Sequence, residues 1–142
     1  MANQADFSGA SLQNATLSRT NLVLSSFVEA NLTNALLKDS LIGGSDFSNA
    51  VLNDTDFHRS DISSQAKFDG ASLINAQLDE VNASTTSFKG ANLTGASIRS
   101  SLLHYADFTN AILTDVSFED SIGFDVLWPT GFDPIAAGFL ES

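Results

Sequence analysis

The sequence contains no cysteine, which excludes disulfide bonds and thiolate metal sites. It also lacks any long apolar run: none approaches the roughly 18–20 consecutive apolar residues that a membrane-spanning helix needs. No membrane span is therefore predicted. At 142 residues, with 43% hydrophobic residues, the chain has the length and the apolar content for one domain with a continuous core.

Basic residues are scarce. There are 6 Lys plus Arg against 17 Asp plus Glu, a formal net charge of −11. Nucleic acids and anionic lipid surfaces attract proteins largely through the negative charge of their phosphates, so a strongly acidic chain is repelled by them. The composition predicts no direct binding to nucleic acid or to an anionic membrane surface.

A large apolar residue recurs every five positions from Phe7 to about residue 123, with one extra residue inserted at residues 63–65. A period of five fits neither the 3.6 of a helix nor the 2.0 of a long strand. Within one quintet a small residue and the large one, such as Ala5 and Phe7, lie two apart and point to the same face of a short extended piece. The next two residues must then turn a corner. Four corners close a square coil of 20 residues, and such coils can stack through backbone hydrogen bonds.

A second period, of 20 residues, gives each side of the square its own identity. Phenylalanine recurs on the first side and leucine on the second, and these residues are the predicted structural core: Phe7, Phe27, Phe47, Phe68, Phe88, Phe108, Leu12, Leu32, Leu52, Leu73, Leu93 and Leu113. The third side begins with Leu17 and the fourth with Leu22. Each buried large side chain contributes roughly 1.5–3 kcal/mol.

The corner residue, two after the large apolar one, is mostly Gly or Asn on the first two sides. Both residues tolerate the positive φ of a type II turn. The third and fourth sides instead have residues such as Arg19, Asp39, Leu24 and Tyr105 at this position. Their turns are therefore predicted to be of another type.

The quintets Ala5-Asp6-Phe7, Ala30-Asn31-Leu32, Ala91-Asn92-Leu93 and Ala106-Asp107-Phe108 resemble those of the pentapeptide repeat proteins. The resemblance implies an all-β fold, a right-handed quadrilateral β-helix, here of about six 20-residue coils. The segment Trp128-Pro129-Thr130-Gly131-Phe132-Asp133-Pro134 is similar to the tail of many cyanobacterial members. This source implies a cytoplasmic protein, or one of the thylakoid lumen if a targeting segment precedes this numbering.

Two regions are predicted: a pentapeptide-repeat β-helix over residues 1–123 and a capping segment over residues 124–142. In the cap, Asp133-Pro134 has the composition of a helix start, which predicts a short helix there. Only residues 1–4 precede the first coil, which is expected to be open. A homodimer through the C-terminal segment or through the open first coil is an alternative to a simple cap.

No set of residues predicts catalysis, so the chain is not expected to be an enzyme. His58 and His104 follow large apolar residues on different sides, and no serine, carboxylate pair or second histidine recurs beside both. The Gly-Gly-x-Gly-x-Asp pattern of calcium solenoids does not occur. Catalytic, cofactor-binding and metal-binding residues are therefore predicted to be absent, and no cofactor is expected.

The fourth side is unusual because apolar residues occupy outward positions where Ser or Asn is usual, and exposed apolar clusters commonly mark contact surfaces. The candidate partner surface is Val23, Leu24, Leu41, Leu102, Tyr105, Ile122 and Phe124. The alternative is that the insertion or the tail folds over part of this side.

Two functions follow from these features. The first is a non-catalytic scaffold or adaptor that presents its fourth side to a protein partner of unknown identity. The second, which the family resemblance permits and the net charge of −11 favours, is a DNA-mimicking inhibitor of a type II topoisomerase, DNA gyrase.

Overall fold

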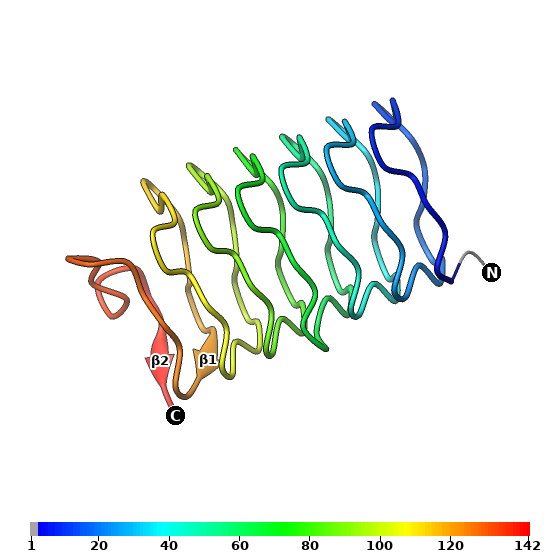
Figure 1. The fold of residues 1–142 in the computed structure, drawn as a ribbon. Coiled ribbons are helices and arrows are strands. Elements are labelled where there is room, and N and C mark those ends of the chain that lie inside the picture. Colours follow the sequence, from blue (N-terminus) through cyan, green and yellow to red (C-terminus); the bar gives the residue numbers. More distant parts are fainter. Residues whose placement is uncertain (1–2) are drawn as a thin grey trace.

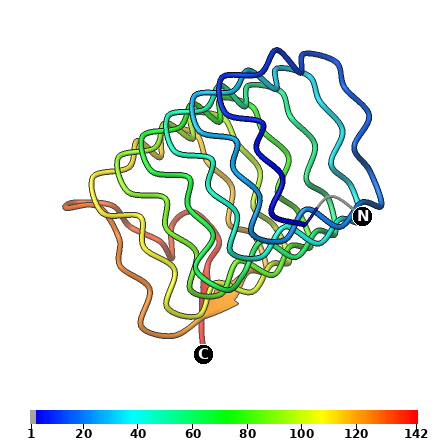
Figure 2. The ribbon, with the colours of Figure 1, turned by 45° about the vertical axis from the view of Figure 1, so that its right-hand side comes forward.

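The computed structural model describes residues 3–142 as a rod of stacked coils, with the two ends of the chain at opposite ends of the rod (Figure 1). Isolated parallel β-bridges join equivalent residues of successive coils, as in Asp6↔Ser26 and Ser26↔Asp46. Similar series of bridges run along all four sides of the square, so the coils form a four-sided, all-β solenoid (Figure 2). Residues 1–2 lie outside the described part of the chain.

The extra residue is absorbed at one corner. Bridges join residues 20 apart up to Leu41↔Asp61, 21 apart from Asp46↔Lys67 to Asp61↔Asn82, and 20 apart again from Lys67↔Ser87 onward. Ser64 and Gln65 both have positive φ, at 59° and 66°, so the insertion widens a single turn. The register of the sides before and after it is unchanged.

The interior is filled by stacked rings. Phe27 and Phe47 lie parallel with ring centroids 4.6 Å apart, and Phe47 and Phe68 follow at 4.9 Å. The predicted core residues from Phe27 to Phe108 and from Leu32 to Leu93 are fully buried, and Leu113 is nearly so. Phe7 and Leu12, in the first described coil, are only partly buried, as expected for a coil with no neighbour before it.

Small hydroxyl residues share this interior because each hydroxyl is bonded across coils. Ser45 Oγ donates to the carbonyl of Leu22 at 2.6 Å and accepts from the backbone N–H of Ser25 at 3.2 Å. Ser60 repeats the pattern with Leu37 and Ser40. A buried hydroxyl is costly only when it lacks a partner, so these serines cross-link the coils.

The prediction of a different turn on the third and fourth sides is wrong. Arg19, Leu24, Asp39 and Tyr105 have φ values of 57°, 58°, 55° and 58°, the same left-handed conformation as the Gly and Asn corners. The reason is the next coil: Arg19 N donates to Lys38 O at 2.8 Å and Leu24 N to Gly43 O at 3.1 Å. The stacking bonds impose one corner geometry on every side, whatever residue occupies it.

The two named strands lie at the C-terminal end, where β1 (Ile122–Gly123) pairs in parallel with β2 (Leu140–Glu141) (Figure 1). Between them, residues 134–138 form turns, so the predicted short helix is absent. Asp133 does accept a hydrogen bond from Ala136 N, as a helix cap would. The chain must, however, return at once to the last coil, where Phe118 N donates to Ala137 O at 2.8 Å.

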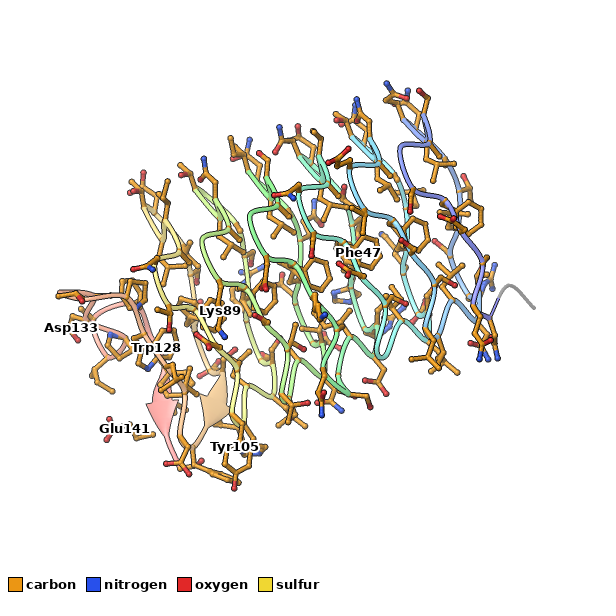
Figure 3. The ribbon with its side chains drawn as sticks, in the orientation of Figure 1. Phe47, Lys89, Tyr105, Trp128, Asp133 and Glu141 are labelled. Atoms are coloured by element: carbon orange, nitrogen blue, oxygen red, sulfur yellow. The ribbon has the colours of Figure 1, made fainter. Side chains whose placement is uncertain are left out.

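The tail covers the end of the core with aromatic rings. Trp128 stacks on Phe108 at 5.2 Å with an interplanar angle of 7°, and it packs against Phe132 and the buried Phe139 (Figure 3). Leu127, Ile135 and Leu140 of the same tail remain exposed. The division of the chain at residue 123 stays a prediction.

Candidate functional surface

Each quintet of the fourth side has three outward positions: the bridge residue before the large apolar one, the residue after it, and the corner. The bridge positions run Asn21, Leu41, Asp61, Asn82, Leu102 and Ile122 from coil to coil. All the predicted surface residues occupy one of these positions, so their side chains lie along one side of the rod. The structure places them in two groups rather than in one continuous surface.

The first group, Val23, Leu24 and Leu41, is called the N-terminal patch. Leu24 and Leu41 are 57% and 50% exposed. Together with Gly43, Gly44, Asp61 and Ser64 they line a groove of about 270 Å³. Gly44 makes room for this packing, because a Cβ atom there would come within 2.7 Å of Leu24 Cδ2.

The second group, Leu102, Tyr105, Ile122 and Phe124, is called the C-terminal patch. Tyr105 and Phe124 are 54% and 41% exposed and meet edge to face, with ring centroids 4.8 Å apart. Tyr105 projects near the bottom of the rod, close to β1 (Figure 3). Ring-to-ring contact holds these side chains in place without burying them, which leaves a preformed apolar surface.

Polar residues separate the two patches. The coils between them contribute Ser63, Ser64, Asn82, Ser84 and Thr85 to the outward positions. The insertion does not fold over the fourth side, and neither does the tail, since large apolar residues of both patches remain exposed. The sequence alternative of a covered side is therefore wrong.

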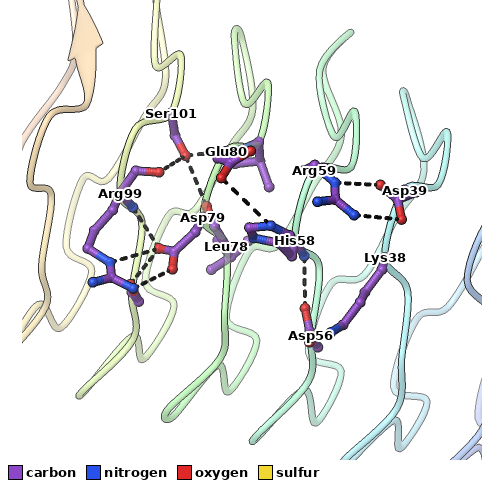
Figure 4. Close-up of polar contacts among 12 residues, drawn as sticks. Lys38, Asp39, Asp56, His58, Arg59, Leu78, Asp79, Glu80, Arg99 and Ser101 are labelled. Carbon is purple, nitrogen blue, oxygen red and sulfur yellow. Dashed lines mark hydrogen bonds and ion pairs between the residues drawn. The ribbon is translucent and has the colours of Figure 1, made fainter.

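The six basic residues lie on the first and third sides of the described rod: Arg19, Lys38, Arg59, Lys67, Lys89 and Arg99. On the third side they form ion pairs with acids of adjacent coils (Figure 4). Arg59 binds both carboxylate oxygens of Asp39, with the shorter contact at 2.7 Å, and Lys38 lies 2.8 Å from Asp56. The third side is thus largely neutralised, whereas the fourth side carries Asp61 and Asp125 without a cation.

These contacts shift the carboxylates of the ladder. The hydrogen bond from Arg59 holds the pKa of Asp39 below its usual value. Burial alone would raise the pKa of Asp79, but hydrogen bonds from Arg99 and Ser97 outweigh it, so this pKa is also lowered. The charged forms of these acids are the ones that the fold stabilises.

The histidines do not form part of a reactive group. His58 lies 3.8 Å from Glu80 on the third side, and His104 packs its ring on Phe124 with centroids 4.3 Å apart. Within residues 3–142, no three His, Asp or Glu side chains come close enough together to hold a metal ion. Nor do the described residues include a helix long and apolar enough to cross a bilayer.

Sequence reasoning missed two features of the surface. Ile112 is 49% exposed on the second side, and Leu36 projects from the third side. Both sit at bridge positions, so the position itself was the available signal. Trp128 follows Phe108 by 20 residues, and this spacing alone could have shown that it continues the ring stack.

A family model described as pentapeptide repeats matches the chain in 8 copies, over residues 3–39, 30–64, 66–104 and 91–122. None of the curated proteins matches the sequence. The family match covers both the insertion's neighbours and the coils that carry the two apolar patches.

Solved structures of this kind share the fold. HetL from the cyanobacterium Nostoc sp. strain PCC 7120, involved in heterocyst differentiation regulation, is 28% identical with a TM-score of 0.84. The match covers 87% of this chain but only 57% of the HetL chain. A thylakoid-lumen protein of Arabidopsis thaliana is 25% identical over 84% of this chain and 71% of its own, with a TM-score of 0.42. Full-length QnrB1, a plasmid-mediated fluoroquinolone resistance protein, is 16% identical over 99% of this chain and 81% of its own, with a TM-score of 0.44.

Proposed function

Because the chain belongs to the pentapeptide repeat family, we propose that it is a non-catalytic scaffold that binds a protein partner through its fourth side. We take the solenoid to be right-handed with about six coils, as the resemblance implies. HetL is involved in regulation, and we propose a regulatory binding role of the same broad kind for this chain. Since the chain spans 57% of HetL, this role is carried over only as a proposal.

One observation carries the proposal: two preformed apolar patches stand exposed on a single side of a rigid rod. Exposed apolar side chains at packed positions are typical of binding surfaces. The ring stack and the cross-coil hydrogen bonds keep the patches at a fixed separation. A rigid surface loses little conformational entropy when it binds, which favours recognition over catalysis.

The test compares partner capture by the native chain and by Leu102→Asn/Tyr105→Asn, with Ile112→Asn as the matched control. Asparagine already occupies equivalent positions at Asn82, Asn92 and Asn110, so all three substitutions suit the repeat. We expect a partner that the native chain and the control retain and the double variant loses. Equal retention by all three proteins would overturn the assignment of this surface.

The second candidate, inhibition of a type II topoisomerase by DNA mimicry, rests on the net charge of −11. The arrangement of that charge weighs against it, because the third side neutralises several of its acids with basic residues in adjacent coils. A gyrase supercoiling assay tests it directly. Inhibition at micromolar protein would favour mimicry over the scaffold role.

A further inference from the structure

The fourth side combines apolar patches with uncompensated negative charge. None of the six basic residues lies on this side of the described rod, and the ion pairs among residues 3–142 all join residues of the first or third side. Asp61 therefore stands among apolar neighbours without a cation. Apolar contact with this surface leaves an acidic charge that a partner can complement.

Asp61 is built into the groove of the N-terminal patch. Its Oδ1 accepts a hydrogen bond from Ser63 N at 3.0 Å, which fixes the carboxylate beside Leu24 and Leu41. The groove measures about 270 Å³. Apolar cavities of about 150 Å³ take a benzene ring, so this groove has room for an aromatic or branched side chain next to the carboxylate.

A similar combination occurs at the C-terminal patch. Asp125 occupies the exposed corner after Phe124, one coil beyond Tyr105, with a φ of 53°. Each patch thus pairs an apolar surface with one carboxylate. The two combinations are related by the stacking of the coils, so their separation is set by the rod.

The separation defines the length of the ligand. Leu41 and Leu102 are three coils apart and Leu24 and Tyr105 are four, which corresponds to about 14 and 19 Å at about 4.8 Å per coil. Residues eleven apart on one face of a helix are about 16 Å apart. Residues four to six apart in an extended chain span about 13–20 Å.

We infer that the fourth side binds a basic, amphipathic segment of a protein partner, which places one apolar side chain in the groove beside Asp61 and another on the C-terminal patch. This inference rests on the proposed function and specifies the partner's chemistry. A second copy of this chain is a poor fit, because its net charge of −11 would bring acids against Asp61 and Asp125. An anionic lipid or a nucleic acid is repelled for the same reason.

The probe is a fluorescein-labelled helical peptide of leucine and lysine, with its leucines on one face, titrated into the full chain and followed by fluorescence anisotropy. A twin peptide with every lysine replaced by glutamate tests charge. The apolar variants are Leu24→Asn/Leu41→Asn and Leu102→Asn/Tyr105→Asn, and the apolar control is Ile112→Asn. Asn21 occupies the same bridge position as Leu41, so the first double variant also suits the repeat.

Charge is tested by Asp61→Asn against Asp115→Asn. Both remove one negative charge, and both place asparagine where equivalent positions already have it, at Asn21 and Asn82 for the first and Asn34 and Asn75 for the second. Asparagine keeps the Oδ1 that accepts from Ser63 N. A diffuse attraction of the cationic peptide to an acidic protein would be weakened equally by both.

We expect the lysine peptide to bind, each apolar double variant to weaken it about tenfold, and Asp61→Asn to weaken it about threefold. Ile112→Asn and Asp115→Asn should leave the affinity unchanged, and the glutamate peptide should not bind. Equal effects of the two aspartate variants, or no binding of the lysine peptide, would overturn the inference. Equal binding of both peptides, lost in the apolar variants, would overturn the basic character of the partner while leaving the proposed binding surface standing.

Discussion

At the scale of single residues, the corner is where sequence preference and structure disagree most. Every coil places its corner residue at positive φ, including Arg19, Leu24, Glu29 and Tyr105. For an L-residue other than Gly or Asn this conformation costs about 1–2 kcal/mol. The hydrogen bonds to the next coil supply what these residues lack in preference, so corner substitutions should reveal the stored strain.

Glu29 is the clearest case. It has a φ of 59° at a first-side corner where neighbouring coils have Gly9 and Asn49. We predict that Glu29→Asn raises the free energy of unfolding by about 0.5–1 kcal/mol, because asparagine adopts the left-handed conformation more readily. Urea denaturation followed by circular dichroism measures the change.

Glu29→Gln is the control, since it removes the same charge without changing the conformational preference. It should stabilise the protein less than Glu29→Asn. Equal stabilisation by both variants would mean that charge, rather than backbone strain, limits stability at this corner.

At the scale of elements, the last coil and its tail behave as one unit. Trp128 takes the place that a seventh phenylalanine would have, stacked on Phe108 and packed edge to face on Phe118. β2 closes the fourth side by its pairing with β1. The stability of this end therefore depends on a ring rather than on a helix.

We predict that Trp128→Ala destabilises the chain by about 3 kcal/mol, the low end for truncating a packed aromatic residue. Trp128→Phe should cost clearly less, because phenylalanine occupies the equivalent position in the other coils. Circular dichroism in urea measures both, since this is the only tryptophan. The exposed Ile135 gives the control: if Ile135→Ala were as destabilising as Trp128→Ala, the ring stack would not be what holds the end.

The ion-pair ladder of the third side predicts a pH dependence. Asp39 and Asp79 have pKa values below the ordinary 3.8 in the folded chain. A lowered folded-state pKa contributes stability that is fully present above the unfolded-state pKa and is lost as pH falls through the folded-state value. The free energy of unfolding should therefore decrease below about pH 4.

Asp39→Asn/Asp79→Asn should flatten this acid limb in urea titrations between neutral and acid pH. Asp115→Asn, which removes an exposed carboxylate outside the ladder, should leave the limb unchanged. An acid limb of the same slope in the double variant would show that other carboxylates govern acid unfolding.

At the scale of the whole molecule, the two periods in the sequence determined most of the fold. A quintet turns one corner, so residues 20 apart had to stack, and the buried rings from Phe27 to Phe108 follow from that spacing. The corner conformation could not be predicted residue by residue, because bonds between coils impose it. The tail could not be predicted because its path depends on the coil that it must cover.

The candidate surface was predicted in its residues but not in its arrangement. The outward positions of Leu24 and Tyr105 follow from the repeat, whereas the groove beside Leu24 depends on Gly44 and on the widened turn at Ser64. The contact of Tyr105 with Phe124 joins residues of two coils, and its geometry required the structure. Four distinct sides on one rigid rod are what make a scaffold role physically reasonable.

The most direct test of this role is photo-crosslinking in the native cells, with a benzophenone amino acid placed at Leu102 in one protein and at Ile112 in another. Both positions are exposed apolar bridge positions, on the fourth and second sides respectively. We predict a discrete crosslinked protein from position 102 and none from position 112. The same crosslinked proteins from both positions, or none from 102, would contradict a scaffold that works through its fourth side.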